Sequence, residues 1–558
     1  MLQPLAVLFL IPLLQAAATD HRNDYDVQLY RLDLEVQPET KLISGRVGME
    51  FHVTADSMSR VDLDIGKALK AEQAWILDQP LEKGWAGRKL QFEQAAGSLQ
   101  IQLAQPAKKG ERLAIAIRYS GSPRGRGFSG FHWAKTPSGK PWINTSCQGP
   151  GAQSWWPCKA SFFHPEDKPD RGMLIEYTVP KGLTAVANGR LLGSKKSKDG
   201  KWTTWSWRHE YPLCTYSVTL NVAPYLHRKI PLKVKGTGLD SFEYWVLPEN
   251  IEKADLQFKD VPEMLAIYSK AFGPFPFPKS KFALVETNFW GMEHSTAVAY
   301  GSSYPKWLQK HGKRDPHGSR NKFYDYILIH ESAHEWWGNG VSARTWGDFW
   351  IHEGFGTYAE GVYLEATRGR KEADRWFRTI RGMAMGPQAR LFRGKNVDSG
   401  QAYSGVIYYK GAWVLNTLRT FVDDDEVWWK TIRDFNMAFR YKNAETADFQ
   451  AILEKNTGKE WKQFFDEWVY QPGVPKLTGT ITATKEGIVV DLDNAQRTGR
   501  VYHLPLDITW LEGRKEKKTR LWLGPGETKK VIPTQRKAKE VHLPTLDRIL
   551  CGRRIEIS

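Results

Sequence analysis

The segment from residue 330 to residue 334 reads His-Glu-Ser-Ala-His and holds three side chains suited to metal and proton chemistry. It lies in an apolar periodic stretch that begins near Phe323 and stops at Gly338-Asn-Gly, which predicts a helix. Residues four apart share one face of a helix, so His330 and His334 can reach a single cation. Glu331 can hydrogen-bond a metal-bound water without acting as a ligand. We therefore expect a zinc site with Glu331 as the general base.

A catalytic zinc ion has three protein ligands and an open fourth position, so a third ligand is expected elsewhere. Glu353 is the candidate, because the segment 347–360 predicts a second amphipathic helix with Asp348 as its N-cap. Eighteen residues separate His334 from Glu353, which is enough for a turn and a returning helix. His352 would point to another face of that helix and is predicted to pack beside the site.

Two other interpretations of residues 330–334 are less favourable. The zinc pattern HExxHxxGxxH is excluded, because Trp337 stands at its Gly position and Gly340 at its third His position. A histidine pair satisfied in a protein core would need neither the helical context nor the spaced glutamate.

The chain of 558 residues is long enough for several domains, and its patterning changes twice. Short alternating segments predict an N-terminal antiparallel β domain over residues 20–227. A helical period then predicts a mixed, mainly helical domain over residues 228–472. Alternating strands return over residues 473–558 and predict a small β-sandwich. The expected fold class is α+β with three domains.

The composition narrows the possible partners. Lys and Arg number 79 against 62 Asp and Glu, a net charge of +17, yet no arginine-rich tract or nucleic-acid module accompanies it. No nucleic-acid partner is therefore expected, and nothing in the sequence indicates an oligomeric state. Four cysteines are too few for a disulfide scaffold. Cys147 and Cys158 either pair or remain buried thiols.

Residues 1–19 are predicted to be a signal peptide. An apolar run from Leu5 to Leu14 precedes the small residues Ala16, Ala17 and Ala18. This run is too short for a membrane span of about 20 residues, and no later segment is predicted to span one. We expect an exported protein, periplasmic or secreted.

The segments His330-Glu-Ser-Ala-His-Glu-Trp-Trp-Gly-Asn-Gly-Val341 and Trp350-Ile-His-Glu-Gly-Phe-Gly-Thr-Tyr-Ala-Glu360 resemble the aminopeptidase N family of zinc metallopeptidases. This family also contains the leukotriene hydrolase/aminopeptidase. The resemblance runs from about residue 20 to the end and implies a β domain, a thermolysin-like catalytic domain and a β domain. It also implies one zinc ion per chain and peptide substrates with a free N-terminus.

Three further segments assign roles through this resemblance. Trp290-Gly-Met-Glu-His294 is similar to the family's GxMEN, which implies that Glu293 binds the substrate's α-amine. Tyr408-Tyr-Lys-Gly411 is similar to YxKG, which implies that Tyr408 stabilises the oxyanion. Ser146-Cys-Gln148 is similar to a segment whose glutamine assists amine recognition, which implies that role for Gln148.

The sequence departs from the family pattern in two ways. Trp290 and His294 stand where the family has Gly and Asn, which changes the contact that this Asn makes. The sequence also ends after the small β domain, without the large helical C-terminal domain of many members. We therefore expect a more open site with weaker selection for peptide length.

Three hypotheses follow for the activity. The leading one is an aminopeptidase, because an uncompensated Glu293 near the metal favours a protonated N-terminus over an internal peptide segment. The second is a thermolysin-like endopeptidase. The third is a zinc-bearing binding protein without catalysis, which Glu331 and Tyr408 argue against because metal binding needs neither.

Overall fold

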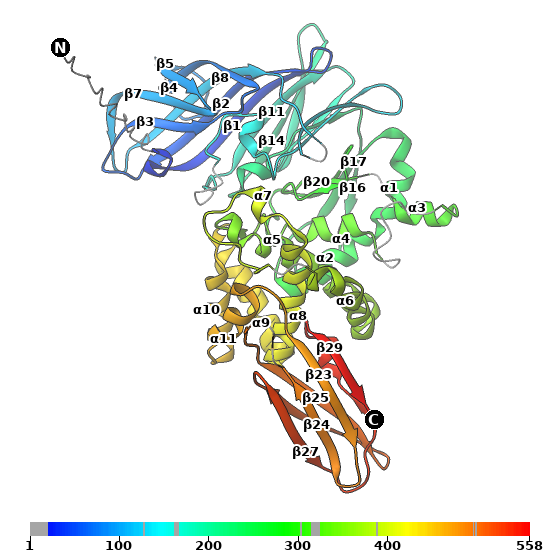
Figure 1. The fold of residues 1–558 in the computed structure, drawn as a ribbon. Coiled ribbons are helices and arrows are strands. Elements are labelled where there is room, and N and C mark those ends of the chain that lie inside the picture. The colour runs from blue at the N-terminus through cyan, green and yellow to red at the C-terminus, as the bar shows by residue number, and fades with distance from the viewer. Residues whose placement is uncertain are drawn as a thin grey trace, which may run out of the picture.

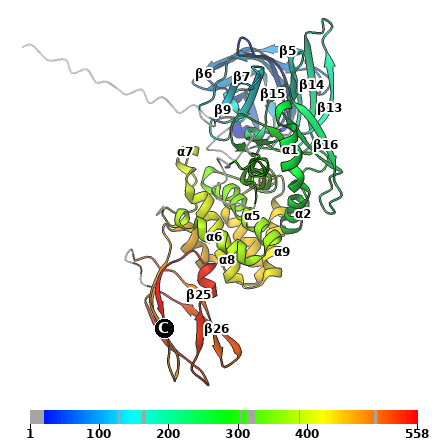
Figure 2. The same ribbon diagram turned by 90° about the vertical axis from the view of Figure 1, so that its right-hand side faces the viewer.

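The structure is a computed structural model that describes residues 20–126, 129–160, 167–301, 304–313, 324–386, 389–494, 496 and 499–558. The predicted signal peptide and Phe323 lie outside these residues. Figure 1 shows three domains in a row: a β domain at the N-terminal end, a helical domain in the middle and a β-sandwich at the C-terminal end. A view at right angles has the same arrangement (Figure 2). The predicted α+β fold class with this domain order is confirmed.

The N-terminal domain is built on an eight-stranded sheet whose strands follow the order β13-β14-β11-β1-β2-β8-β4-β5. Strands such as β11 alternate buried and half-buried residues, as expected for a sheet with one face on the core. β1 and β11 pair in parallel, whereas the sequence predicted an antiparallel domain. The strands are β1 (Tyr25–Gln37), β2 (Leu42–Val53), β4 (Leu69–Leu77), β5 (Gly87–Leu90), β8 (Arg112–Gly121), β11 (Met173–Pro180), β13 (Arg190–Lys196) and β14 (Trp202–His209).

Two smaller sheets complete this domain. One has the order β3-β7-β6 and the other β12-β15-β10-β9. Their strands are β3 (Ser57–Asp64), β6 (Phe92–Ala95), β7 (Ser98–Lys108), β9 (Gly130–Lys135), β10 (Pro141–Ser146), β12 (Thr184–Val186) and β15 (Asn221–Ala223). The last strand of the domain, β15, ends at Ala223, three residues before the middle domain begins at Leu226.

The middle domain begins with a five-stranded sheet of order β16-β17-β18-β20-β19, in which β19 is an edge strand. The strands are β16 (Leu226–Pro231), β17 (Ser241–Val246), β18 (Phe282–Glu286), β19 (Gly291–Met292) and β20 (Val298–Tyr300). The helices are α1 (Ile251–Gln257), α2 (Val261–Phe272), α3 (Pro305–Lys310), α4 (Tyr326–Ala333), α5 (Trp350–Arg368), α6 (Arg370–Met385), α7 (Ser399–Ala402), α8 (Gly411–Val422), α9 (Asp425–Phe439), α10 (Thr446–Thr457) and α11 (Lys462–Phe465). A short parallel pair joins β21 (Ser342–Ala343) to β22 (Asn443–Ala444).

Helix α5 is the centre of this domain. Fifteen consecutive residues, from Trp350 to Leu364, are buried, because other helices cover it on all sides. A Cβ atom added at Gly354 would lie 3.0 Å from the Cα atom of Gly411. The two glycines therefore allow the backbones of α5 and α8 to approach closely.

The helix boundaries around the metal motif differ from the prediction in two places. α4 ends at Ala333, and His334 is its C-cap, whereas the sequence predicted a helix through Trp337. Asp348 is not the N-cap of α5. A 3₁₀ turn over Trp346–Asp348 continues into the helix, and the Asp348 carboxylate instead accepts hydrogen bonds from the backbone N–H and the hydroxyl of Thr446.

The C-terminal domain is a sandwich of a four-stranded sheet, β27-β24-β23-β29, and a three-stranded sheet, β26-β25-β28. The strands are β23 (Lys476–Ala483), β24 (Gly487–Asp493), β25 (Leu504–Glu512), β26 (Lys515–Leu523), β27 (Glu527–Pro533), β28 (Lys539–His542) and β29 (Gly552–Ile557). The predicted β-sandwich is confirmed.

Two further expectations concern cysteines and membrane spans. No disulfide joins the cysteines of the described ranges, and Cys147 and Cys158 are buried thiols. Burial raises the pKa of the Cys147 thiol to about 12, so it is protonated. Within the described ranges, every helix is too short or too polar to cross a bilayer.

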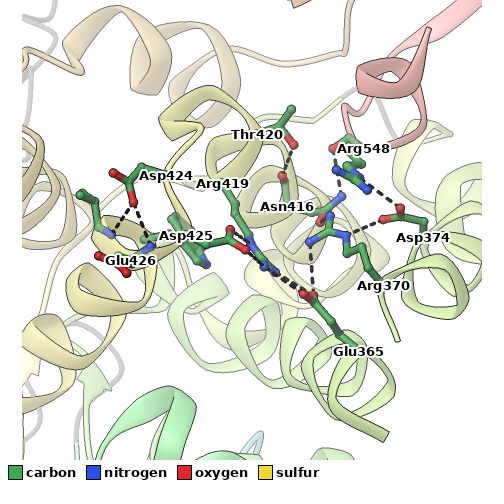
Figure 3. A network of polar contacts seen from close by, with 12 residues as sticks. Glu365, Arg370, Asp374, Asn416, Arg419, Thr420, Asp424, Asp425, Glu426 and Arg548 are labelled. Carbon is green, nitrogen blue, oxygen red and sulfur yellow. Dashed lines mark hydrogen bonds and ion pairs between the residues drawn. The ribbon is translucent and has the colours of Figure 1, made fainter. Parts of the chain in front are cut away.

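A network of ion pairs lies where the sandwich meets the helical domain (Figure 3). Arg419 on α8 forms two-pronged contacts with Glu365 at 2.7 and 2.9 Å and with Asp425 at 2.6 and 2.7 Å. Arg548, from the sandwich, donates to Asp374 on α6 at 3.1 Å, and its carbonyl oxygen accepts from Asn416 at 2.9 Å. The network thus orders the ends of α5, α6 and α8 against the third domain.

We predict that Arg419→Met lowers the free energy of unfolding by about 2 kcal/mol, because its charged hydrogen bonds to Glu365 and Asp425 are lost. Glu365 keeps Arg370 as a partner and Asp425 is 64% exposed, which limits the effect. The Arg419 side chain is only 6% exposed. The matched control is Arg375→Met, whose side chain is 65% exposed beside Glu372, and a change below about 1 kcal/mol is expected. Urea unfolding followed by fluorescence measures both. Equal effects of the two substitutions would contradict the structural role of the network.

Candidate active site

Helices α4 and α5 bring the three predicted metal ligands together. The Nε2 atoms of His330 and His334 lie 3.3 Å apart. Each is close to Oε2 of Glu353, at 3.4 Å from His330 and 3.5 Å from His334. All three side chains are almost completely buried. The three atoms therefore form a nearly equilateral triangle.

This triangle fits a zinc ion. Ligand bonds of about 2.0–2.2 Å in tetrahedral geometry separate neighbouring ligand atoms by about 3.3–3.6 Å. Oε2 of Glu353 has no hydrogen-bond partner within the described chain, although it is buried. A buried carboxylate oxygen without a partner is costly, so a cation at this point would complete the site.

The second nitrogen of each imidazole is held by a hydrogen-bond acceptor. Nδ1–H of His330 donates to Oε1 of Glu360 at 3.0 Å, and Nδ1–H of His334 donates to the carbonyl oxygen of Trp337 at 2.8 Å. Tyr324 donates to the other oxygen of Glu360 at 2.5 Å. Both rings are therefore oriented with Nε2 toward the metal position, where a bound metal ion would take the place of a proton.

Sequence reasoning did not assign a role to Glu360. The signal was present, since Glu360 follows Glu353 by seven residues and lies on the same face of α5 two turns later. The role of Glu360 becomes evident only in the structure, where its carboxylate contacts the imidazole of His330.

The predicted general base, Glu331, faces the edge strand β19. A Cβ atom added at Gly291 would lie 2.7 Å from Oε1 of Glu331, so only glycine fits there without displacing the carboxylate. Burial is the main cause that raises the pKa of Glu331 above its usual value, and His330 and His334 oppose this shift. A raised pKa suits a group that must accept a proton and then return it.

Glu293 directly follows β19, the strand that Glu331 faces. It is buried, and its Oε1 accepts hydrogen bonds from Nε2 of Gln148 and from the hydroxyl of Tyr216, the latter at 3.1 Å. The predicted pair of Gln148 and Glu293 is thus in contact. Burial is the main cause that raises the pKa of Glu293 to about 7, and the charge of His334 lowers it. Such a carboxylate gains from a cationic partner.

Tyr216 was missed by sequence reasoning. It comes from a short 3₁₀ turn of the N-terminal domain, Thr215–Ser217, which has no motif. Its oxygen also lies 3.2 Å from Nδ1 of His352, and Nε2 of His352 accepts from the backbone N–H of Ala343 at 2.8 Å. His352 therefore supports Tyr216 and is directed away from the metal triangle, in line with the packing role predicted for it.

Tyr408 packs beside the first metal ligand, His330. It lies in a π-helical turn, Val406–Lys410, and its ring stacks at 6.1 Å from the ring of His330, with 21° between the planes. Burial raises the pKa of Tyr408 well above its usual value, so the phenol stays protonated. A protonated phenol can donate a hydrogen bond to an oxygen that gains negative charge.

His294 is the residue that replaces the family asparagine, and it differs from the other site residues. It is fully buried, and neither ring nitrogen has a hydrogen-bond partner in the described ranges. Burial lowers the pKa of His294 to about 3, so the ring is neutral. The structure thus gives His294 no polar contact with Glu293 or the metal triangle.

A cavity of about 60 Å³ opens beside these groups. Its lining includes Gln148 and Tyr216, which contact Glu293, and also Phe349 and His352 from the start of α5. The two side chains that hold Glu293 therefore lie at the wall of an open space, whereas Glu293 and the three metal ligands do not line it.

Comparison with known families assigns most of the chain to two family domains. The Peptidase M1 N-terminal domain matches residues 25–217, and the Peptidase family M1 domain matches residues 256–468. The chain belongs to peptidase family M1. The second match contains the metal triangle, Glu331, Glu293 and Tyr408, and the first contains Gln148 and Tyr216.

Individual members of the M1 family are distantly similar to this chain. Leucine aminopeptidase 2 of Phaeosphaeria nodorum is 24% identical over 81% of this chain and 72% of its own length. Probable aminopeptidase 2 of Sulfurisphaera tokodaii is 23% identical over 72% of this chain and 50% of its own length. Aminopeptidase N of Streptomyces lividans is matched over 38% of its length. The chain thus spans between 38% and 72% of the length of these relatives.

Solved structures share the fold. The M1 zinc metallopeptidase from Deinococcus radiodurans has a TM-score of 0.64 and 21% identity, covering 80% of this chain and 93% of that chain. A mutant from the same organism, bound to a Tyr-Ser-Ala substrate, also has a TM-score of 0.64, with 20% identity. This M1 chain therefore has the architecture of known M1 zinc metallopeptidases.

We predict that Glu360→Gln weakens zinc binding by about 10- to 100-fold, because the imidazole of His330 loses a charged acceptor at Nδ1. The measurement is competition with a chromogenic chelator, read as zinc retained per chain. Glu372→Gln, a change of the same type at a carboxylate of α6 that pairs with Arg375, is the matched control and should retain zinc like the wild type. Equal zinc affinities for all three proteins would show that Glu360 does not tune the ligand.

Proposed function

We propose that this protein is a zinc aminopeptidase that removes the N-terminal residue of peptides, with one zinc ion held by His330, His334 and Glu353. The observation that carries the proposal is the buried Glu293 with Gln148, placed on one side of a triangle of metal ligands and Glu331. The M1 family membership and the aminopeptidase names of similar proteins support it.

The site supplies a group for each step of peptide hydrolysis. Zinc at the three ligands would polarise the scissile carbonyl and lower the pKa of a water molecule. Glu331 accepts a proton from that water as the oxygen attacks the carbonyl carbon. The same carboxyl then gives the proton to the leaving amine nitrogen as the C–N bond breaks. Tyr408 donates a hydrogen bond to the carbonyl oxygen while its negative charge develops.

Glu293 makes the reaction selective for chain ends. A peptide with a free N-terminus brings an ammonium group, which pairs with the buried carboxylate and has three donors for Glu293 and its neighbours. An internal peptide segment or a blocked N-terminus brings no charge and leaves Glu293 without a cationic partner. This argues against the endopeptidase alternative. Glu331 and Tyr408 argue against a zinc-binding protein without catalysis, since neither is a ligand.

We also propose that the protein acts outside the cytoplasm, in a periplasm or after secretion. The support is the apolar run of residues 5–14 followed by small residues, which resembles a signal peptide. Comparison of the N-terminal residue of the protein purified from its native source with Met1 tests this proposal. A mature protein that begins near residue 20 is the expected result.

The function is tested with paired fluorogenic aminoacyl amides that differ only in acetylation of the α-amine. We expect cleavage of the free-amine compounds alone, and loss of cleavage after chelation with recovery on zinc addition. Glu331→Gln should lower kcat by about 10²- to 10⁴-fold, because proton transfer is lost while the ligands remain. Glu293→Gln should lower kcat/KM for free-amine substrates and reduce the preference over acetylated ones. Glu252→Gln, on the exposed side of α1, is the control.

Two results would change the assignment. Cleavage of acetylated amides at rates equal to the free amides would identify an endopeptidase-like site. Bound zinc without turnover of any substrate would favour the binding-protein alternative.

A further inference from the structure

Asn339 lies in the turn that follows α4, five residues after the metal ligand His334. It is completely buried, and its backbone N–H donates to the carbonyl oxygen of His334 at 2.9 Å. Its side-chain nitrogen Nδ2 donates to the carbonyl oxygen of Glu293 at 2.8 Å. One residue therefore contacts both the main chain of a metal ligand and the main chain of the proposed amine anchor.

The other atom of the Asn339 amide contacts the N-terminal domain. Its Oδ1 accepts from the hydroxyl of Ser217 at 3.0 Å, and the oxygen of that hydroxyl accepts from the backbone N–H of Ser295 at 2.8 Å. An amide supplies a donor and an acceptor at once, and both are used here. The backbone that follows Glu293 is thus held directly by Asn339 and indirectly through Ser217.

The chain makes a strained turn directly after Glu293. Thr296 has a φ angle of 60°, in the left-handed region that β-branched residues rarely adopt. The backbone N–H of Ala297 donates to the carbonyl oxygen of His294 at 3.1 Å and closes the turn. Such a conformation persists only where the surroundings hold it.

Glu335 supplies a contact that holds this turn. It directly follows the ligand His334 in the chain and is completely buried. Its Oε1 accepts from the backbone N–H of Thr296 at 2.6 Å. The turn after the second metal ligand therefore contacts the segment 293–296 at two points, through Asn339 at its start and through Glu335 at its end.

These contacts bear on the distance between the metal and Glu293. The α-amine and the scissile carbonyl belong to the same substrate residue, so both can be bound at once only if Glu293 and the metal are correctly spaced. A misplacement of about 1 Å can lower a rate by about 100-fold. Hydrogen bonds between the backbones of the two sites restrict such a shift.

We propose that Asn339 and Glu335 are positioning residues, which hold Glu293 at the distance from the metal that lets one substrate residue bind both. This inference rests on the proposed aminopeptidase function. The two side chains act through the backbone of residues 293–296 and not by contact with the substrate. Their loss therefore weakens recognition of the amine and leaves the metal ligands in place.

The experiment measures the contribution of an α-amine to binding. Leucine hydroxamate and isocaproyl hydroxamate share the zinc-binding group and the side chain and differ only in the α-amine. Calorimetry gives the Kd of each for the zinc-loaded protein, without the need for turnover. The wild type should bind leucine hydroxamate about 10- to 100-fold more tightly, because charged hydrogen bonds form with the amine.

Asn339→Ala and Glu335→Ala should each reduce this ratio by about three- to tenfold, because a buried hydrogen bond to the anchor segment is lost. The zinc content and the Kd of isocaproyl hydroxamate should stay at their wild-type values. Glu335→Gln retains an oxygen that can accept from Thr296 and should keep most of the ratio. Ser217→Ala is a smaller change to the same contacts, and it tests the inference if a larger substitution prevents folding.

Asn416→Ala is the matched control. Asn416 is also completely buried, its Nδ2 donates to the carbonyl oxygen of Arg548 at 2.9 Å, and its Oδ1 accepts from Arg370 at 2.9 Å. These contacts lie at the junction with the C-terminal sandwich. Asn416→Ala should therefore have the wild-type ratio even if it lowers the stability of the protein.

Two outcomes would overturn the inference. The wild-type ratio in Asn339→Ala, Glu335→Ala and Ser217→Ala, with zinc bound, would show that these contacts do not position Glu293. An equal loss of affinity for both hydroxamates, or the same loss of ratio in Asn416→Ala, would show a general structural role. Equal affinities of the wild type for the two hydroxamates would instead refute the amine anchor on which the proposed function rests.

Discussion

The convergence of three ligand atoms within 3.5 Å of one another is the constraint on which the rest of the site depends. Around it lie four buried carboxylates, those of Glu293, Glu331, Glu353 and Glu360, and two imidazoles whose Nδ1 atoms are held by hydrogen-bond acceptors. Such a group of anions is costly to bury without counter-charges. A divalent ion at the three ligand atoms would balance Glu353 and Glu360. Under the proposed function, the substrate's ammonium group would balance Glu293 and the proton from water would balance Glu331. The electrostatics of the site thus favour the complex that reacts.

Small residues make this convergence possible. Gly356 lies on α5 opposite His334, where an added Cβ atom would come within 2.9 Å of the ring carbon Cε1. Gly354 allows α8 to approach α5 from the other side, and Gly291 allows β19 to reach Glu331. Two of these glycines contact a side chain of the site, His334 or Glu331. The third, Gly354, lies on the helix that carries Glu353. The burial of α5 on all sides then limits its movement relative to α4.

The parts of the site that the sequence predicted are those that local geometry determines. Residues four apart, such as His330 and His334, share a face in any helix. The connection from His334 to Glu353 is short, so the second helix returns beside the first. The three-domain order followed from changes of hydrophobic period, which burial imposes directly. The missed features depend on packing between distant segments. Tyr216 reaches Glu293 across 77 residues of sequence, and Asp348 bonds Thr446 across 98. The parallel pairing of β1 with β11 is likewise set by topology, because a strand has the same residue pattern in either direction.

The division of the site between two domains separates its chemistry from its selectivity. The metal ligands and Glu331 lie on α4 and α5, within one domain. Glu293 is held by Gln148 and Tyr216, and both of these residues come from the N-terminal domain. Hydrogen bonds from Asn188 to Ser295, from Gly189 to Thr296, and from Ser295 to Ser217, at 2.7–2.8 Å, fasten the segment after Glu293 to that domain. Under the proposed function, a change at the domain interface would therefore alter recognition of the amine before it alters binding of the metal.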